Sequence, residues 1–325
     1  MTIRVGIFGY GNLGKGVCYA VDMAPDMECV GIFTRRNADS IKPVTNVSVY
    51  NVSELEKFKG KIDVLLLCGG SATDLPETTA NYLKDFNTVD SFDTHAKIPE
   101  YYEKLSKVAL ESKKVSAISI GWDPGLFSIM RLTFSSVLPN GTDYTFWGKG
   151  VSQGHSDAIR RIKGVKNAIQ YTIPKEEALL AVRNGENPKL TTREKHLREC
   201  FVVLEDGADK NFVENEIKCM PNYFADYDTI VNFVSEEELK EKHSKLPHGG
   251  FVIRTGNTTK ENGEKIEFSL KLDSNPEFTG SVLTAYARAV YRLSKKGESG
   301  VYTVFDIPLK YLSPLSEEEL RATLL

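Results

Sequence analysis

The chain has no excess of charge of either sign. Among its 325 residues, Lys and Arg number 41 and Asp and Glu number 44, so the formal net charge is −3. Proteins that bind nucleic acid or an anionic membrane surface need a basic excess or at least a basic run. The sequence also lacks any stretch near the roughly 20 apolar residues that a membrane-spanning helix requires. We therefore expect neither nucleic acid nor a membrane among the partners.

Cysteine pairs and clusters of metal ligands are missing as well. The cysteines are odd in number, widely spaced and without a C-x-x-C pair; they are Cys18, Cys29, Cys68, Cys200 and Cys219. We expect buried thiols in a reducing cytoplasm. The five histidines form no H-E-x-x-H motif and no Cys/His cluster, so we expect no metal. The first residues show no signal-peptide pattern, which predicts no export by the usual route.

What the chain does contain is typical of a globular protein. Hydrophobic residues make up 41% and charged residues 26%, a mixture that argues against disorder. The length allows about two domains.

The first 120 residues alternate between strand and helix patterns. Short apolar runs predict strands at 3–8, 27–33, 63–68, 87–90 and 115–120, and the segments between them predict helices at 13–23, 76–84 and 98–112. This alternation predicts an α/β fold of the Rossmann type, a doubly wound parallel sheet with helices on both faces.

The pattern changes after Gly121. A helix is predicted at 127–138, and beyond it come runs of period two, such as 265–272, that predict a sheet with one polar face. Further helices are predicted at 175–184, 208–219 and 235–243. This part predicts a second domain of α+β type. A helix at 276–295 and a strand at 301–305 end the chain.

The turn after the first strand fits G-x-G-x-x-G at Gly9, Gly11 and Gly14. The first glycine permits a tight turn, the second lets a diphosphate approach the backbone, and the third lets helix and strand pack closely. The N–H groups at the start of the helix then face the anion. A plain glycine-rich turn is the alternative, but the position between a strand and a helix favours a dinucleotide site.

The end of the second strand indicates which dinucleotide binds. NAD enzymes place a carboxylate there for the ribose 2′-hydroxyl, whereas this chain has Thr34, Arg35 and Arg36. Two guanidinium groups and a hydroxyl suit a 2′-phosphate. The alternative is a pair of solvated surface arginines. We predict NADP as the cofactor.

The segment from Cys68 to Asp74 follows the third predicted strand, at the sheet edge where ligands bind in open α/β folds. Its small residues allow a ribose and phosphates to pass closely. An ordinary strand-to-helix loop with Ser71 or Thr73 as the helix N-cap stays open as an alternative.

Taken together, the motifs resemble the meso-diaminopimelate dehydrogenase family from end to end. The resemblance lies in Gly-Tyr-Gly-Asn-Leu-Gly at 9–14, Gly-Ser-Ala-Thr-Asp at 70–74, Gly-Trp-Asp-Pro-Gly at 121–125, Phe-Trp-Gly at 146–148, Ser-Gln-Gly-His-Ser-Asp at 152–157, Pro-His-Gly-Gly at 247–250 and Leu-Lys-Leu-Asp-Ser-Asn-Pro at 270–276. Generic Rossmann enzymes do not share the third and fifth of these.

The resemblance implies an activity and an organisation. The activity is NADP-dependent, reversible oxidative deamination at the D-centre of meso-2,6-diaminopimelate, which gives L-2-amino-6-oxopimelate and ammonia in lysine biosynthesis. The resemblance also implies a cytoplasmic homodimer with a closing active site. It further implies a dinucleotide-binding domain of residues 1–121 and 277–325 and a substrate-binding and dimerisation domain of 122–276.

The resemblance implies the site residues too. The cofactor would contact Gly9, Gly11, Asn12, Leu13, Gly14, Thr34, Arg35, Arg36, Cys68, Gly69, Ser71, Ala72, Thr73 and Asp93. The substrate would contact Asp93, Trp122, Asp123, Trp147, Gln153, Gly154, Thr172, Arg198, His248 and Asn275.

Asp93 and Asp123 would be the catalytic residues, because carboxylates there can hold the reacting ammonium group. Base action by Asp123 or a bound water is an additional possibility. Trp122 and Trp147 would form pocket walls, and the N–H groups of Gln153 and Gly154 would bind the carboxylate at the D-end.

At the L-end, Thr172, Arg198 and His248 would bind the other carboxylate, and Asn275 would lie beside the amino group. A bidentate guanidinium suits a carboxylate. The segment around Arg198 matches the family less well than the glycine motifs do, so its register is less secure. His155 and Asp157 are expected to be structural.

If the family resemblance is set aside, the same residues allow simpler interpretations. Each tryptophan could be a core residue, each aspartate a helix cap, Arg198 a surface charge and His248 a turn residue. Other functions that keep the Rossmann domain are a dihydrodipicolinate-reductase-like enzyme, a broad D-amino acid dehydrogenase, and a catalytically idle NADP sensor that binds partners.

Overall fold

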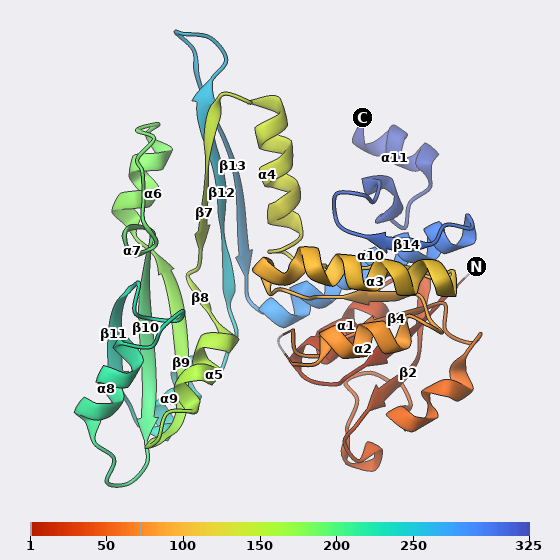
Figure 1. Cartoon of the computed structure of the whole chain (residues 1–325), viewed down its shortest axis with the longest axis horizontal. Helices are drawn as coiled ribbons and strands as arrows, with labels where there is room; N and C mark the ends of the chain where they lie inside the picture. The colour runs from red at the N-terminus through yellow and green to blue at the C-terminus, as the bar shows by residue number, and fades with distance from the viewer. Residues whose placement is uncertain (1, 72) are drawn as a thin grey trace. The chain divides into compact units, whose positions relative to one another are not determined.

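The computed structural model describes residues 2–71 and 73–325. Contacts within the chain divide it into two compact units, one of Met1–Ile129 with Pro276–Leu325 and one of Met130–Asn275. The second unit is therefore an insertion into the first. Figure 1 shows the chain coloured from the N-terminus to the C-terminus, with many of its helices and strands labelled.

The first unit is built on a seven-stranded sheet in the order β14-β6-β5-β4-β1-β2-β3. Every strand pair in it is parallel. The strands are β1 (Ile3–Phe8), β2 (Met27–Thr34), β3 (Val49–Asn51), β4 (Val64–Leu67), β5 (Thr88–Asp90), β6 (Val115–Ala117) and β14 (Gly300–Tyr302). The chain reverses direction across the sheet between β1 and β4, the switch point at which doubly wound sheets bind their ligands.

Helices cover both faces of this sheet. On one face, α1 (Asn12–Asp22) and α10 (Asn275–Lys295) supply core residues such as Val17 and Leu283. On the other face, α2 (Leu75–Tyr82) and α3 (Ile98–Ser112) supply residues such as Leu75 and Leu105. The strands are buried on both sides, which is why β4 consists only of apolar residues.

The second unit contains two sheets. One has four strands in the order β11-β10-β9-β8 and the other three in the order β13-β12-β7. Their bounds are β7 (Gly141–Trp147), β8 (Gly150–Val151), β9 (Val165–Pro174), β10 (His196–Leu204), β11 (Asp228–Phe233), β12 (His248–Asn257) and β13 (Gly263–Leu272). All pairs are antiparallel except β10 with β11. Figure 1 shows β7, β12 and β13 side by side.

Helices of the second unit pack on these sheets. Ile159 of α5 and Val213 of α8 join the core of the four-stranded sheet, whereas Leu179 of α6 packs with Phe146 and Ile253 of the three-stranded sheet. The helices are α5 (Gln153–Arg160), α6 (Glu176–Arg183), α7 (Thr192–Lys195), α8 (Lys210–Lys218) and α9 (Glu236–His243). The helix α4 (Leu126–Val137) begins in the first unit and ends in the second.

Short elements complete the chain. They are the 3-10 helices η1 (Ala38–Ser40), η2 (Val52–Phe58), η3 (His95–Lys97) and η4 (Leu309–Tyr311), and the last helix α11 (Glu317–Leu324). Among the described residues, no helix is long and apolar enough to cross a membrane.

The predicted fold class is confirmed, with corrections to single elements. The strand predicted at 115–120 ends at Ala117, because Ser119 has φ +58° and its N–H turns to the side chain of Asp90. The strand predicted at 301–305 ends at Tyr302. The prediction that all cysteines are buried is wrong for Cys219, which is exposed beside the end of α8; Cys18 and Cys200 are buried, and Cys29 and Cys68 are half-buried.

Candidate active site

The glycine turn lies at the switch point of the seven-stranded sheet. Gly9 has φ +89° and donates its N–H to the carbonyl of Phe33 at 2.9 Å, which bends the chain sharply after β1. A side chain at Gly14 would collide with the Gly9 carbonyl, so only glycine allows α1 to begin this close to β1.

The start of α1 fits a phosphate group. Gly11 is the N-cap residue, no side chain caps the helix, and the first turn, which begins with Asn12 and Leu13, holds no acidic residue. A Cβ placed on Gly11 would meet no atom within 4 Å. The first N–H groups of the helix therefore have no side-chain cap, and such groups bind anions.

Cationic side chains follow β2. The buried Thr34 accepts a hydrogen bond from the Arg36 N–H at 3.2 Å, and the Arg36 guanidinium donates to the carbonyl of Tyr10 in the glycine turn. Arg35 forms an ion pair with Asp74 at 2.6 Å and donates to Thr78. The end of β2 thus carries two guanidinium groups held by hydrogen bonds. The ion pair between Arg35 and Asp74 was not expected from the sequence.

The loop after β4 is tied to the loop after β5. The Cys68 N–H donates to Phe8 at 2.8 Å, and a Cβ on Gly69 would crowd the Asp74 carboxylate. The Ser71 hydroxyl accepts from the Asp93 N–H at 2.8 Å and lies 3.3 Å from the Thr94 hydroxyl. Of the other predicted cofactor contacts here, Thr73 lies in the same loop, and Ala72 lies outside the described residues.

Neither Ser71 nor Thr73 caps α2. The N-cap residue of α2 is Asp74, and its side chain makes no capping hydrogen bond. The expectation that Ser71 or Thr73 caps the helix is therefore wrong. Asp93 does not cap a helix either, because Thr94 and Lys97 are the N-cap residues of η3 and α3.

A buried carboxylate joins the loops that carry Asp93 and Asp123. Asp90, fully buried at the end of β5, accepts from the N–H groups of Phe92 at 3.0 Å and Ser119 at 3.1 Å. Its other oxygen accepts from the Tyr101 hydroxyl at 2.7 Å and from Thr79. Burial raises the pKa of Asp90 although these hydrogen bonds oppose the shift. Sequence reasoning missed this residue because an Asp at a strand end resembles any loop carboxylate.

Trp122 and Asp123 lie in a tight turn that starts α4. Gly125 has φ +137° and leaves no room for a side chain beside the backbone of Gly121. The Phe127 N–H donates to the Trp122 carbonyl at 2.8 Å, and the rings of these two residues meet edge to face at 5.1 Å. Trp122 is buried and Asp123 is half-buried, and the turn fixes the backbone that carries both residues.

In the second unit, Gln153 and Gly154 are the first residues of α5. Ser152 caps this helix by accepting from the His155 N–H, and its hydroxyl also lies 2.7 Å from Nδ1 of His155. Gln153 and Gly154 are exposed, and a Cβ on Gly154 would meet nothing within 4 Å. Their N–H groups precede the first intrahelical hydrogen bonds and suit a carboxylate.

The predicted residues for the distal carboxylate come together in the second unit. Thr172 of β9 pairs with Arg198 of β10 and with Gly150 of β8, and the Arg198 guanidinium donates to the Thr172 hydroxyl. A side chain on Gly150 would collide with His248. The Asn275 N–H donates at 2.9 Å to Leu246, close to His248 in the chain. The pairing of β9 with β10 therefore places Arg198 directly opposite Thr172.

Arg198 is a buried cation. It is 7% exposed, and its Nε has no hydrogen-bond partner in the described structure. Among residues 2–71 and 73–325 it forms no ion pair; its guanidinium instead stacks on the ring of Tyr227, at 3.9 Å from the centroid. Burial lowers the pKa of Arg198. A buried cation without a counter-ion is costly, and an anionic ligand removes that cost.

His196, which the sequence did not single out, holds Trp147. The Trp147 N–H donates to Nε2 of His196 at 2.9 Å, and the two rings stack with centroids 5.3 Å apart. His196 is fully buried, and burial together with the nearby Arg198 lowers its pKa to about 3. Its neutral ring therefore positions the indole. No local motif in the sequence signals this contact.

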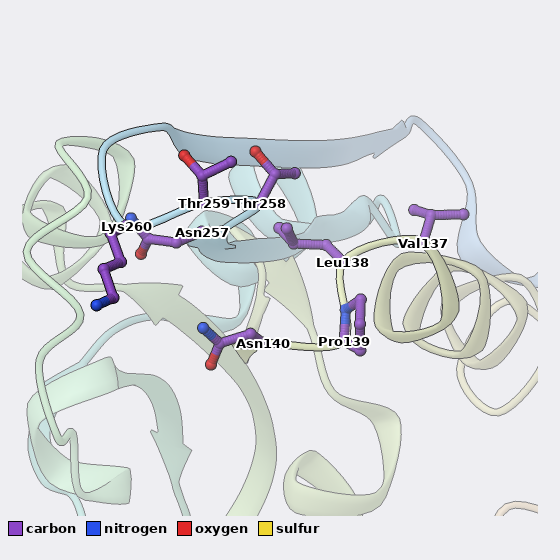
Figure 2. A pocket seen from close by; sticks show the side chains of 8 residues that line it. All are labelled: Val137, Leu138, Pro139, Asn140, Asn257, Thr258, Thr259 and Lys260. Carbon is purple, nitrogen blue, oxygen red and sulfur yellow. The ribbon is translucent and has the colours of Figure 1, made fainter.

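A surface hollow in the second unit lies away from the predicted residues. It is formed by the end of α4 and the β12–β13 hairpin, and Figure 2 shows its lining side chains. They include the cation Lys260 and no carboxylate, and none of them is a predicted site residue. No group of three or more His, Cys, Asp or Glu side chains in the described part of the chain could hold a metal ion.

Comparison with known proteins gives consistent matches. Residues 121–274 match the family model of the diaminopimelic acid dehydrogenase C-terminal domain. The meso-diaminopimelate D-dehydrogenase of Ureibacillus thermosphaericus is 62% identical over 99% of each chain. A crystal structure of an engineered D-amino acid dehydrogenase bound to NADP+ is 42% identical, with TM-score 0.89 and full coverage of both chains.

A six-fold mutant of the Clostridium tetani meso-diaminopimelate dehydrogenase, solved with DAP, is 54% identical, with TM-score 0.95 over the whole of both chains. The residue types replaced in that mutant are Gln, Thr, Arg, Pro, His and Asn. The same types occur in this chain in the same order and at the same intervals, at Gln153, Thr172, Arg198, Pro247, His248 and Asn275. Pro247 is absent from the residues predicted from the sequence.

Proposed function

The chain belongs to the meso-diaminopimelate D-dehydrogenase family, and on that premise we propose its reaction and site. It is an NADP-dependent enzyme that reversibly deaminates the D-centre of meso-2,6-diaminopimelate, with L-2-amino-6-oxopimelate and ammonia as products, in lysine biosynthesis. The observation that carries this conclusion is the 62% identity over 99% of both chains.

The described residues of the first unit fit NADP. The open N-terminus of α1 suits the diphosphate, and Arg35 and Arg36 suit the 2′-phosphate. The loop with Cys68, Gly69, Ser71 and Thr73 lies after β4, at the same switch point. When bound, the nicotinamide accepts the hydride from the substrate's D-carbon.

We assign the reacting amino group to Asp93 and Asp123. Both follow strands of the seven-stranded sheet, and Asp90 and Ser71 fix the loops that carry them. Two carboxylates hold an ammonium group by charge, and Asp123 is the residue we propose to accept its proton, directly or through water. Trp122 and Trp147 then restrict which centre of the substrate reacts.

The carboxylates of the substrate are assigned to the second unit. The N–H groups of Gln153 and Gly154 take the one at the D-end. Arg198, Thr172 and His248 take the one at the L-end, with Asn275 beside the amino group there. The support is the buried, unpaired state of Arg198 and the six matching residue types of the Clostridium tetani mutant solved with DAP.

We also propose that the enzyme is a cytoplasmic homodimer and that residues 122–276 form its substrate-binding and dimerisation domain. Sedimentation equilibrium should give twice the mass of one chain across the micromolar range. A monomer at every concentration would contradict the dimer.

The test of the activity uses the three isomers of 2,6-diaminopimelate. With NADP+, the meso isomer should generate absorbance at 340 nm. The L,L isomer should not, because it lacks a D-centre. The D,D isomer tests whether the enzyme requires the L configuration at the distal centre. No increase in absorbance at 340 nm with any of the three isomers would refute the proposed reaction.

In a matched variant, Asp123→Asn should abolish turnover and leave NADP+ affinity unchanged.

A broad D-amino acid dehydrogenase is the second candidate, since an engineered enzyme with that description is 42% identical to this chain. The distal Arg198 site speaks for the narrower substrate. A panel of neutral D-amino acids decides between the two: comparable kcat/KM for these and for the meso isomer would favour the broad activity.

A further inference from the structure

The stacking of Arg198 on Tyr227 has no role in the function proposed above. The ring lies 3.9 Å from the guanidinium carbon, the shortest cation-to-ring distance among those found in the described structure. One guanidinium nitrogen donates to Thr172, and Nε has no partner. The face of the cation is therefore covered by an aromatic ring, whereas Nε on its hydrogen-bonding edge has no partner.

The chain holds Tyr227 from both sides. The Tyr227 N–H donates at 2.9 Å to Phe224, whose side chain is fully buried in the core under the four-stranded sheet. The next residue, Asp228, forms ion pairs with Lys175 at 2.6 Å and Arg193 at 2.8 Å. Asp228 also begins β11, which pairs with β10. The ring is thus supported by residues that belong to the scaffold of the sheet.

We propose that Tyr227 is a positioning residue that fixes the plane of the Arg198 guanidinium, so that its hydrogen-bonding edge selects substrates with a distal carboxylate. The inference rests on the proposed function. A guanidinium binds a carboxylate best with two parallel N–H groups, which requires a defined plane. An aromatic face supports that plane and adds attraction to the cation.

The alternative is that Tyr227 only packs against the strand. In that case its loss would reduce the amount of folded enzyme, which lowers the apparent kcat, and would treat all substrates alike. A positioning role predicts a different result: KM for substrates with a distal carboxylate rises, while kcat and the KM for NADP+ stay the same, because the reacting end of the substrate is not affected.

The experiment compares Tyr227→Leu with Tyr227→Phe. Leucine removes the aromatic face, and we expect KM for meso-2,6-diaminopimelate to rise about ten-fold, with kcat within about two-fold of the parent enzyme. Phenylalanine keeps the face and should retain nearly the parent KM. Tyr227→Gln serves as a second non-aromatic variant if the leucine variant does not fold.

A pair of substrates sharpens the test. D-2-aminopimelate has the distal carboxylate but no distal amine, and D-lysine has the amine but no carboxylate. In Tyr227→Leu, kcat/KM should fall for D-2-aminopimelate and stay unchanged for D-lysine.

Three results would overturn the inference: an unchanged KM in the leucine variant, equal losses in the leucine and phenylalanine variants, or a parallel loss for both substrates of the pair. Failure of the proposed function itself would show separately, as a parent enzyme that does not oxidise meso-2,6-diaminopimelate.

Discussion

Gly11 is the N-cap residue of α1 and Gly16 lies in the second turn of the same helix, and their surroundings differ. A Cβ on Gly11 would meet no atom within 4 Å, whereas one on Gly16 would collide with the carbonyl of Pro276 at the start of α10. The first position is open toward the proposed diphosphate and the second is closed by a helix from the far end of the sequence. A methyl group added at one position or at the other therefore tests NADP+ binding and folding stability separately.

We expect Gly11→Ala to weaken NADP+ binding and to leave the free energy of unfolding nearly unchanged. Gly16→Ala should lower that free energy by about 1–3 kcal/mol, because the added group overpacks the contact between helices. Calorimetric titration and urea unfolding measure the two effects. Full NADP+ affinity in Gly11→Ala would show that the phosphates do not approach α1 here.

Arg36 determines the choice between NADP+ and NAD+ in our interpretation. Arg36→Ala should weaken NADP+ by about 1.5–3 kcal/mol, the range for a charged hydrogen bond, and barely change NAD+ binding. Arg35→Ala should cost less, because Arg35 already shares its charge with Asp74. Dissociation constants for both cofactors provide the measurement, and equal losses for NADP+ and NAD+ would contradict the assignment.

At the level of single residues, the sequence predicts the chemical role of a side chain better than it predicts which residues that side chain contacts. The motif at 9–14 and the arginines after β2 identify the cofactor, because their spacing relative to strands has a physical meaning. The pairing of Arg35 with Asp74 and the stacking of Arg198 on Tyr227 join residues far apart in the chain. Such contacts depend on the tertiary fold, which no local pattern contains.

Among the secondary-structure elements, β5 and β6 are followed by loops that the side chain of Asp90 joins. Asp90→Ala would leave the N–H groups of Phe92 and Ser119 without their acceptor in a buried place. We expect a loss of about 3 kcal/mol or more in the free energy of unfolding. We also expect a lower kcat, because the loops with Asp93 and Asp123 lose their common anchor.

Two variants control this prediction. Asp90→Asn keeps one oxygen for both N–H groups and should retain most of the stability and activity. Thr88→Ala removes a buried hydrogen bond between the same two strands without touching the loops; the hydroxyls of Thr88 and Ser116 lie 2.8 Å apart. If Thr88→Ala lowers kcat as much as Asp90→Ala does, the loss reflects general destabilisation.

The start of β10 should make stability depend on pH. His196 has a pKa lowered to about 3 in the folded chain, whereas an unfolded histidine titrates near 6.5. Between these values the unfolded chain binds a proton that the folded chain does not, so stability falls as the pH falls. The expected contribution is up to about 1.4 kcal/mol per pH unit.

Urea unfolding at several pH values between 4 and 7 measures this slope. His196→Gln should reduce it, since glutamine does not titrate and can still accept the Trp147 N–H. Part of the slope should persist, because burial also lowers the pKa of His155 to about 3. The same substitution at the exposed His95 should leave the slope unchanged. An unaltered slope in His196→Gln would show that His196 does not carry the dependence.

The elements that the sequence predicts are those with a simple pattern. Strands such as β4 are continuous apolar runs because both faces are buried, and β13 alternates because one face is polar. The sequence did not reveal β9, because Lys166, Asn167 and Gln170 interrupt its apolar residues. It did not reveal α5 either, whose sequence contains a glycine and a serine and whose start depends on the cap at Ser152.

For the molecule as a whole, the change of pattern after Gly121 signals the second unit, whereas the return of the last helix and strand to the first unit was expected only from the family resemblance. The observed division falls at Ile129 and Met130 and again at Asn275 and Pro276. The helix α4 runs through the first of these points. A helical pattern continues across such a division without interruption, so periodicity alone does not locate it.

The interrupted first unit has a consequence for biosynthesis. Its core draws on Leu283, Tyr286 and Val290 of α10, and β14 completes the edge of its sheet beside β6. The ribosome must therefore release the entire insertion before the amino-terminal residues can complete the core between the sheet, α1 and α10, although α2 and α3 are available earlier to cover the other face. During that interval the nascent chain exposes an unpaired strand edge and the part of one sheet face that α10 later covers, which are the surfaces that chaperones bind and through which unfinished chains aggregate. Meanwhile, the continuous inserted unit is free to fold first.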